Sequence, residues 1–344
     1  MRFAAVNVLH SIVELAELPG PIFLAIGVFD GVHLGHRAVI EHALRAAEAA
    51  GGTPVALTFD PHPAAILRPE QAPALLTSTR HKLRLLGQLG VAHALVADFT
   101  LGFAATPPED FISKLAETAR SLRQICVGEN WAFGKGRKGD LALLRKLGDA
   151  LGFEAVGLPA IAVDGTPVSS TGIRSALEAG DLDLARRMMG RDFSVLGKVI
   201  EGRKLGRTLG FPTANLRPES EQLPPNGVYA VRVIVDPVAA EGTGRAVQTR
   251  NAQSQTPNEK ISPPPSVVGY CGVANIGVRP TVSPQAAERV VEVHLFDFSG
   301  DLYGHDLEVS LLKFLRPEKK FPNLGALRDQ IAADIESAQS ILRV

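Results

Sequence analysis

The chain has 344 residues, a hydrophobic content of 45%, and equal numbers of basic and acidic side chains, 36 of each. This balance gives no global attraction to nucleic acid or to an anionic membrane, so any phosphate binding must be local. The chain shows no secretory-signal pattern, no apolar run of about eighteen residues, and no CxxC pair between its two cysteines. We therefore expect a cytoplasmic protein of two domains.

Short apolar runs alternate with amphipathic segments over roughly residues 21–187. The apolar runs that predict strands are 22–28, 54–59, 92–99, 124–127 and 155–158. The segments that predict helices are 37–50, 79–89, 108–119 and 140–151. This alternation is typical of a parallel sheet covered by helices on both faces, which binds ligands beyond the carboxyl ends of its strands.

A glycine-rich decapeptide, Gly-Val-Phe-Asp-Gly-Val-His-Leu-Gly-His at 27–36, follows the first predicted strand. Its glycines let backbone N–H groups approach an anion, and the following helix N-terminus adds partial positive charge. Because His33 and His36 lie one turn apart, both rings can face one phosphate. The pattern predicts stabilisation of a phosphorus under attack, and two incidental surface histidines are the alternative. The other candidates in this segment are Gly27, Phe29, Asp30 and Gly35.

Three later segments place polar or cationic groups at the ends of predicted elements. Two prolines stiffen the turn that presents Asp60 and His62. The loop 127–139 is rich in glycine and basic residues, which suits a triphosphate or pyrophosphate. Residues 169–175, Ser-Ser-Thr-Gly-Ile-Arg-Ser, combine hydroxyls at a helix N-terminus with Arg174 one turn later. The structural alternatives are a rigid strand end, an exposed basic turn and ordinary helix caps.

The decapeptide resembles the signature of the nucleotidyltransferase superfamily with a His-x-Gly-His motif, in the form found in bacterial bifunctional riboflavin kinase/FAD synthetases. The resemblance implies that Asp60 and His62 lie beside the flavin phosphate or the nucleotide. The loop 127–139 is similar to the family's Val-Gly-x-[Asp/Asn]-Phe-x-Phe-Gly segment, and residues 169–174 to Ser-Ser-Thr-x-Ile-Arg, which in relatives binds the β- and γ-phosphates of ATP. The ATP-binding residues implied by these matches are Gly27, Phe29, Asp30, Gly35, Asn130, Arg137, Ser170, Thr171 and Arg174.

The pattern changes after about residue 190. The β-rich runs 193–200, 228–235, 266–274, 290–298 and 307–314 precede one helical segment, 324–342. They predict an antiparallel barrel or sandwich with a C-terminal helix. We expect an α/β nucleotidyltransferase-type domain at 1–187 and a β-barrel riboflavin-kinase-type domain at 188–344. Residues 236–265, rich in Gln, Asn, Thr and Pro, predict a disordered insertion between strands.

A second glycine-rich turn with cationic side chains spans 202–215. Thr213 and Asn215, at alternate positions, point the same way if the segment is extended. A hydroxyl and an amide oxygen suit a Mg²⁺ ion that keeps waters and bridges nucleotide phosphates. The stretch 210–215, Gly-Phe-Pro-Thr-Ala-Asn, closely resembles the signature of riboflavin kinases. This resemblance implies that Gly206, Gly210, Pro212, Thr213 and Asn215 contact ATP or its metal ion.

Glu292 lies in the alternating segment Val-Glu-Val-His-Leu-Phe. By the resemblance it corresponds to the family's catalytic carboxylate, which can accept the proton of a hydroxyl that attacks a γ-phosphoryl group. Considered without the resemblance, it would be a solvent-facing strand residue. Asn275 and Arg279 belong to a further family segment, and turn residues are the alternative for both.

The resemblance covers nearly the whole chain and implies two reactions. The C-terminal domain would phosphorylate riboflavin with ATP and Mg²⁺ to give FMN, and the N-terminal domain would adenylylate FMN with ATP to give FAD and pyrophosphate. Two alternatives stay open at this point. One is an adenylyltransferase with another acceptor, such as a pantetheine or nicotinate phosphate, against which the 210–215 signature argues. The other is a flavin or nucleotide sensor that binds without turnover.

Overall fold

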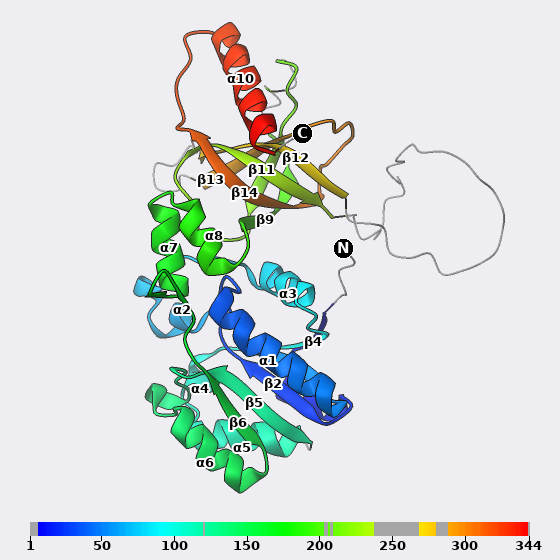
Figure 1. The fold of residues 1–344 in the computed structure, drawn as a ribbon, viewed down its shortest axis with the longest axis vertical. Coiled ribbons are helices and arrows are strands. Elements are labelled where there is room, and N and C mark those ends of the chain that lie inside the picture. Colours follow the sequence, from blue (N-terminus) through cyan, green and yellow to red (C-terminus); the bar gives the residue numbers. More distant parts are fainter. Residues whose placement is uncertain are drawn as a thin grey trace, which may run out of the picture. The chain divides into compact units, whose positions relative to one another are not determined.

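The chain divides into two compact units in a computed structural model (Figure 1). The structure describes residues 6–119, 121–202, 206, 209–236, 268–279 and 288–342. The first unit contains residues 3–191 and 220–223, and the second is formed mainly by 192–219 and 224–344. The predicted insertion at 236–265 lies outside the described residues except for its first position.

The first unit is built on a six-stranded sheet in which every neighbouring pair is parallel. Its order is β1-β4-β3-β2-β5-β6. The strands are β1 (Asn7–Leu9), β2 (Ile22–Ile26), β3 (Thr53–Asp60), β4 (His93–Asp98), β5 (Leu122–Gly128) and β6 (Glu154–Leu158). The predicted parallel sheet is confirmed, although β1 was missed because three residues are too few to show a period.

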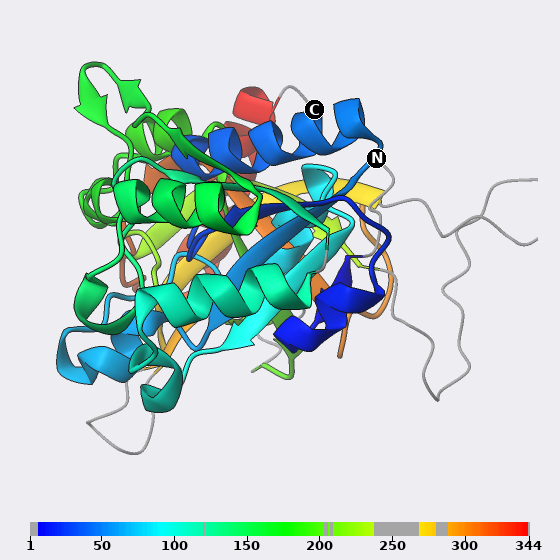
Figure 2. The same ribbon diagram turned by 90° about the horizontal axis from the view of Figure 1, so that it is seen from below.

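Helices cover both faces of this sheet, with α1 and α5 on opposite sides (Figure 2). The α-helices are α1 (Leu34–Ala50), α2 (Pro63–Leu67), α3 (Thr79–Gln88), α4 (Leu101–Ala104), α5 (Pro108–Thr118), α6 (Leu141–Leu151), α7 (Ser170–Glu178) and α8 (Leu182–Met189). Short 3-10 turns, η1 (Ile12–Glu17), η2 (Pro69–Gln71) and η3 (Lys135–Arg137), and a small hairpin, β7 (Ala162–Val163) with β8 (Thr166–Pro167), complete the unit.

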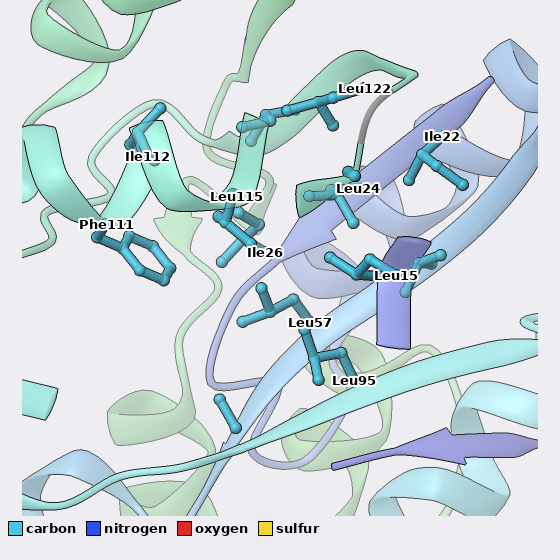
Figure 3. Packing of buried hydrophobic residues seen from close by; sticks show 14 of the residues in the cluster. Leu15, Ile22, Leu24, Ile26, Leu57, Leu95, Phe111, Ile112, Leu115 and Leu122 are labelled. Carbon is cyan, nitrogen blue, oxygen red and sulfur yellow. The ribbon is translucent and has the colours of Figure 1, made fainter. Parts of the chain in front are cut away.

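Alternation along the central strand β2 separates two hydrophobic cores. Leu24 and Ile26 point to the face covered by α5, where they join Ile112 and Leu115 (Figure 3). Ala25, between them, belongs to the cluster formed with α1 on the other face. Because side chains of a strand alternate between faces, a shift of one residue would exchange the two cores, and this fixes the register of β2.

The second unit is a closed barrel with order β10-β13-β12-β11-β14-β9, and all neighbouring pairs are antiparallel. The strands are β9 (Phe193–Ile200), β10 (Ala214–Pro218), β11 (Gly227–Val235), β12 (Val268–Arg279), β13 (Glu288–Leu295) and β14 (Asp306–Arg316). The helix α10 (Leu324–Leu342) packs Ala338 and Leu342 on β11 and β12. The predicted barrel and helix are confirmed. The sequence analysis assigned no strand to 214–218, and β10 closes the barrel there.

The core of the first unit gives a direct stability test. Leu57, on β3, is fully buried, whereas Leu101, on α4, is 70% exposed. Leu57→Ala should lower the free energy of unfolding by about 2–5 kcal/mol, and Leu101→Ala by less than about 0.5 kcal/mol. Urea denaturation followed by fluorescence measures both, because the single tryptophan, Trp131, packs against this core. Equal losses in the two variants would contradict the assignment of the core.

Two candidate active sites

The histidine motif forms the turn between β2 and α1. His33 is the N-cap of α1, and its Nδ1 accepts a hydrogen bond from the backbone N–H of His36 at 3.3 Å. The two imidazole rings stack with centroids 3.6 Å apart, and Phe29 lies edge-on to His36. Phe29, Gly31 and Val32 have φ values of 52°, 81° and 42°. Left-handed backbone at two non-glycine residues is uncommon and typical of functional turns. This cap also explains why α1 begins three residues before the predicted start.

Burial lowers the pKa of both imidazoles. The pKa of His33 falls to about 4, and that of His36 falls well below its ordinary value through burial and then through repulsion by His33 and Lys82. Both rings are therefore neutral near neutral pH. Because Nδ1 of His33 accepts a hydrogen bond, its proton lies on Nε2, which can donate to a ligand oxygen. The pair thus offers N–H donors rather than two positive charges to a phosphate.

A buried ion pair joins Asp30 of the histidine motif to Arg174 of the serine-rich motif, 144 residues later. The Oδ1 atom of Asp30 accepts hydrogen bonds from the backbone N–H groups of Leu76 and Thr77, each at 3.0 Å. Arg174 Nε donates to the carbonyl oxygen of Ala74 at 2.6 Å. The carboxylate is thus satisfied by protein donors, and the pair fixes the loop before α3 as well as the two motifs.

The N-terminus of α7 meets the same turn. Ser169 caps the helix by accepting a hydrogen bond from the N–H of Gly172 at 3.1 Å. The hydroxyl of Ser170 donates to the carbonyl oxygen of Asp30 at 3.0 Å. Thr171 is exposed in the first turn. The structure therefore brings the histidine and serine-rich motifs together, with the N-termini of α1 and α7 as two sources of N–H donors.

An aromatic cavity of about 590 Å³ opens between β3, α4 and the loop that follows β5. Its wall contains the rings of Phe59, Phe99, Phe103, Phe111, Trp131 and Phe133 and the polar side chains of Arg68, Asn130 and Arg137. Trp131 and Phe133 stack with centroids 4.3 Å apart. Flat apolar walls with few polar groups suit a planar aromatic ligand. Asn130 and Arg137 line this cavity, whereas Asp30, Ser170 and Arg174 do not.

The turn after β3 lies between this cavity and the buried ion pair. Asp60, the last residue of β3, is exposed. His62 is half-buried and caps α2, with Nδ1 accepting a hydrogen bond from the N–H of Ala64 at 3.1 Å. Burial lowers the pKa of His62, attraction to Asp30 raises it, and repulsion by Arg174 lowers it further. The protonation of His62 is thus coupled electrostatically to the Asp30–Arg174 pair.

Sequence reasoning missed one charged residue of this region, Lys82 on α3. It is 4% exposed, and its Nζ donates to Thr58 Oγ1 at 3.2 Å and to the carbonyl oxygen of Phe59 at 3.5 Å. The spacing of the helix residues could have revealed it, because Lys82 lies three and four residues before Leu85 and Leu86, on the buried face of the helix. A lysine at the core spacing of an amphipathic helix is a candidate for function.

Three predicted or candidate side chains of the barrel lie in one row across its wall. Glu292 on β13 is directly opposite Asn215 on β10 and directly opposite Asn275 on β12. Opposite residues of antiparallel strands project from the same face, with Cβ atoms about 4.5–5.5 Å apart. The half-buried Glu292 is therefore flanked by two amides. Asn275 is a strand residue rather than a turn residue, and the side chain of Arg279 lies outside the described part of the chain.

Two cavities of the barrel share Thr213 in their walls. One, of about 300 Å³, also contains Asn275, Glu292 and His294, and the other, of about 290 Å³, contains Pro212, Phe298 and Tyr303. His294 Nδ1 donates to the carbonyl oxygen of Pro212 at 2.9 Å and so holds this turn against β13. A group transferred between ligands in the two cavities would pass beside Thr213.

Close packing requires glycine at two positions of the predicted turn. A Cβ at Gly202 would lie 2.0 Å from the amide nitrogen of Asn215. A Cβ at Gly206 would lie 2.3 Å from the carbonyl oxygen of Phe211 and 3.3 Å from Thr213 Oγ1. These glycines therefore leave room for the two predicted metal ligands. Residues 203–205, 207 and 208 lie outside the described chain, and Gly210 has a φ of 88°.

Comparison with known proteins assigns both halves of the chain. A family model described as FAD synthetase matches residues 16–172, and one described as riboflavin kinase matches residues 189–342. The bifunctional riboflavin kinase/FMN adenylyltransferase of Escherichia coli K12 is 38% identical over 311 residues, 90% of each chain. That of Buchnera aphidicola subsp. Acyrthosiphon pisum is 30% identical over 338 residues, 98% of this chain and 99% of the other.

A solved structure also aligns with nearly the whole chain. It is a Streptococcus pneumoniae protein described as a macrolide-efflux protein, with a TM-score of 0.74 and 25% identity over 97% of this chain and 99% of that one. Among the described residues of the present chain, none of the helices has the length and apolar character needed to cross a membrane.

A parallel sheet with a histidine turn, followed by a barrel with a carboxylate between two amides, defines a two-domain transferase that acts on nucleotides. The chain belongs to the family of bifunctional riboflavin kinase/FMN adenylyltransferases. It phosphorylates riboflavin to FMN and adenylylates FMN to FAD, with ATP as co-substrate in both steps. The predicted family and function are confirmed. An adenylyltransferase with an unrelated acceptor does not account for the riboflavin kinase match.

Loss of the buried Asp30–Arg174 pair should destabilise the first unit far more than loss of an exposed ion pair. Arg174→Met leaves the Asp30 carboxylate buried without its cation, so the free energy of unfolding of the first unit should fall by about 3–5 kcal/mol. Arg187→Met is the matched control, because the Arg187–Asp164 pair has side chains 47% and 71% exposed and should contribute less than about 1 kcal/mol. Urea denaturation followed by Trp131 fluorescence compares them. A small loss in both would show that Asp30 does not depend on Arg174.

Proposed function

We propose that residues 188–344 form the riboflavin kinase domain and residues 1–187 the FMN adenylyltransferase domain, each with the active site described above. The observation that carries the kinase assignment is that Thr213 lines both barrel cavities, whereas Glu292 lines one of them. Riboflavin would occupy the cavity with Glu292, and the nucleotide of ATP would occupy the other. The γ-phosphate then lies at Thr213, between the two substrates.

Glu292 would act as the general base of the kinase. The terminal ribityl hydroxyl of riboflavin attacks the γ-phosphorus, and its proton passes to the carboxylate. The new O–P bond forms as the bond from the γ-phosphorus to the β,γ-bridging oxygen breaks, which releases ADP. His294 would act as a positioning residue, because its hydrogen bond to Pro212 holds Thr213 between the cavities.

Thr213 and Asn215 fit a Mg²⁺ site in this domain. They offer a hydroxyl and an amide oxygen, and Gly202 and Gly206 leave room beside them. The described residues contain no cluster of three or more His, Cys, Asp or Glu side chains that could hold a metal ion. This suits an ion that is held by few protein groups, waters and substrate phosphates rather than by a protein cage. When bound, Mg²⁺ would offset the charge of the ATP phosphates.

The adenylyltransferase would work by positioning and charge stabilisation. A phosphate oxygen of FMN attacks the α-phosphorus of ATP, and the bond to the α,β-bridging oxygen breaks to release pyrophosphate. No side-chain nucleophile is needed because FMN supplies one. His33 and His36 would donate N–H hydrogen bonds to the oxygens of the α-phosphate, and Ser170 and Thr171 would bind the departing phosphates at the N-terminus of α7. Gly27, Phe29, Asp30, Gly35 and Arg174 would shape the turn and hold these groups in place.

The aromatic cavity would take the isoalloxazine ring of FMN. Its stacked Trp131 and Phe133 match a flat tricyclic ring system. Asp60 and His62, at the end of β3, would lie near the ribityl phosphate. Asn130 and Arg137, in the cavity wall, would reach ATP where the two substrates meet.

We also infer a cytoplasmic location, because both cysteines of the chain are free thiols, as expected in a reducing compartment.

The histidine turn predicts a selective loss of one activity. His36→Ala removes an N–H donor from the adenylyltransferase site, so FAD formation should fall by at least about 10²-fold while FMN formation is retained. The assay incubates the protein with riboflavin, ATP and Mg²⁺ and separates the flavins by chromatography. His42→Ala, half-buried on the same helix, is the control. Equal loss of both products would contradict the division of labour.

Replacement of the barrel carboxylate should have the opposite effect: loss of FMN formation with adenylylation retained. Glu292→Gln cannot accept a proton, so FMN formation should fall by about 10²–10⁴-fold, whereas adenylylation of supplied FMN should be unchanged. Glu336→Gln, exposed on α10, serves as the control. Steady-state rates with riboflavin and with FMN as separate substrates measure the two steps. Retained kinase activity in Glu292→Gln would remove this residue as the base.

A further inference from the structure

Lys82 holds a positive charge inside the first unit without a carboxylate partner. Among the described residues, the hydrogen bonds of its Nζ go to two neutral oxygens, Thr58 Oγ1 and the carbonyl of Phe59, and no ion pair joins it to an acid. Burial of an ammonium group is unfavourable unless an opposite charge offsets it. Lysine is therefore rarely this deeply buried unless it is paired. No carboxylate of the described residues therefore neutralises this ammonium by direct contact.

Acidic and imidazole groups surround this ammonium at longer range. Attraction to Asp30 and Asp60 raises the pKa of Lys82, but burial outweighs both and lowers it to about 8. Lys82 in turn lowers the pKa values of His36, on α1, and His62, on α2. The ammonium therefore acts electrostatically on both the histidine turn and the turn that follows β3, and it contacts the end of β3 directly.

The contact of Lys82 with the end of β3 favours FMN over ATP as the source of an anion for this ammonium. Phe59 contacts Lys82 through its carbonyl oxygen, while its ring lines the aromatic cavity. A flavin stacked in that cavity carries a phosphate at the end of its ribityl chain. The phosphates of ATP have their own donors at the N-terminus of α7, where Ser170 and Thr171 lie. The guanidinium of Arg174 is already engaged by Asp30 and a backbone carbonyl.

We infer that the ammonium group of Lys82 binds the phosphate of FMN and reduces its repulsion from ATP as it attacks the α-phosphorus. The inference rests on the proposed place of the isoalloxazine ring in the aromatic cavity. Lys82 forms no covalent bond: the FMN oxygen forms the new bond to the α-phosphorus, and pyrophosphate leaves. A preorganised cation favours the approach of a phosphate dianion to a polyanion, because it offsets their mutual repulsion. Lys82 is then a catalytic residue that the sequence motifs do not mark.

This role has a pH signature. As pH rises through about 8, a growing share of the free enzyme carries a neutral amine at Lys82, which attracts no phosphate, so kcat/KM for FMN should fall. His36 and His62, with lowered pKa values, are already neutral in that range. The other charged groups that act on Lys82 and His62 include the carboxylates of Asp30 and Asp60 and, for His62, the guanidinium of Arg174. Arg68 and Arg137 line the adjoining aromatic cavity.

Two substitutions in the full chain test the inference. Lys82→Met keeps an unbranched side chain that is one atom shorter and removes its charge, so KM for FMN should rise about tenfold or more and kcat should fall about 10²-fold. KM for ATP should stay within about twofold, and riboflavin phosphorylation should be unchanged. Lys82→Arg should recover part of the FMN affinity and lose the decline of kcat/KM near pH 8, because arginine stays protonated.

The controls separate the possible failures. Lys146→Met, exposed on α6, should leave all constants unchanged. An unchanged KM for FMN in Lys82→Met overturns the inference, and so does a rise confined to KM for ATP. If Lys82→Met does not fold, a decline near pH 8 that persists in Lys82→Arg overturns it. Trp131→Ala tests the cavity by itself: an unchanged KM for FMN there refutes the proposed flavin cavity, whereas the Lys82 variants decide the phosphate contact.

Discussion

The proposed adenylyltransferase site depends on one buried ion pair. Asp30 comes from the turn after β2 and Arg174 from α7, and their contact joins two motifs that are 144 residues apart. Two buried charges are tolerated because backbone groups of Leu76, Thr77 and Ala74 satisfy their remaining hydrogen bonds. Without this pair, nothing described in the structure would hold the N-terminus of α7 against the histidine turn as firmly. The juxtaposition of these two helix N-termini therefore rests on a contact between side chains.

Both proposed active sites would handle polyanions in a protein with no net charge. In the first unit, neutral imidazoles, helix N-termini and the buried ammonium of Lys82 would each act on a small region of the proposed site. In the barrel, the proposed site combines a hydroxyl and amides with a carboxylate, a set that would suit a metal ion shared with the substrate. Electrostatic interactions strengthen as the local dielectric falls. A few buried donors can therefore bind a phosphate group without a large excess of positive charge on the protein.

Periodicity made much of the fold predictable. The helix at 324–342 was predicted with the bounds that the structure shows, and the five longer strands of the sheet were found within about three residues at each end. The four strands that were missed, β1, β7, β8 and β10, are short. β1 has three residues, and β10 follows a glycine-rich turn, where pairing with β9 and β13 rather than the local pattern imposes an extended chain.

The sequence by itself determined the family, the order of the two domains and the residue types at each site, because these depend on motifs in which neighbours in the chain are also neighbours in space. Only the tertiary structure decided that Asp30 faces Arg174, that Glu292 lies between Asn215 and Asn275, and that Lys82 is buried. These facts depend on strand register and on packing between distant segments. Burial also sets protonation, so whether the histidines meet a phosphate as cations or as neutral donors is a property of the fold and not of the motif.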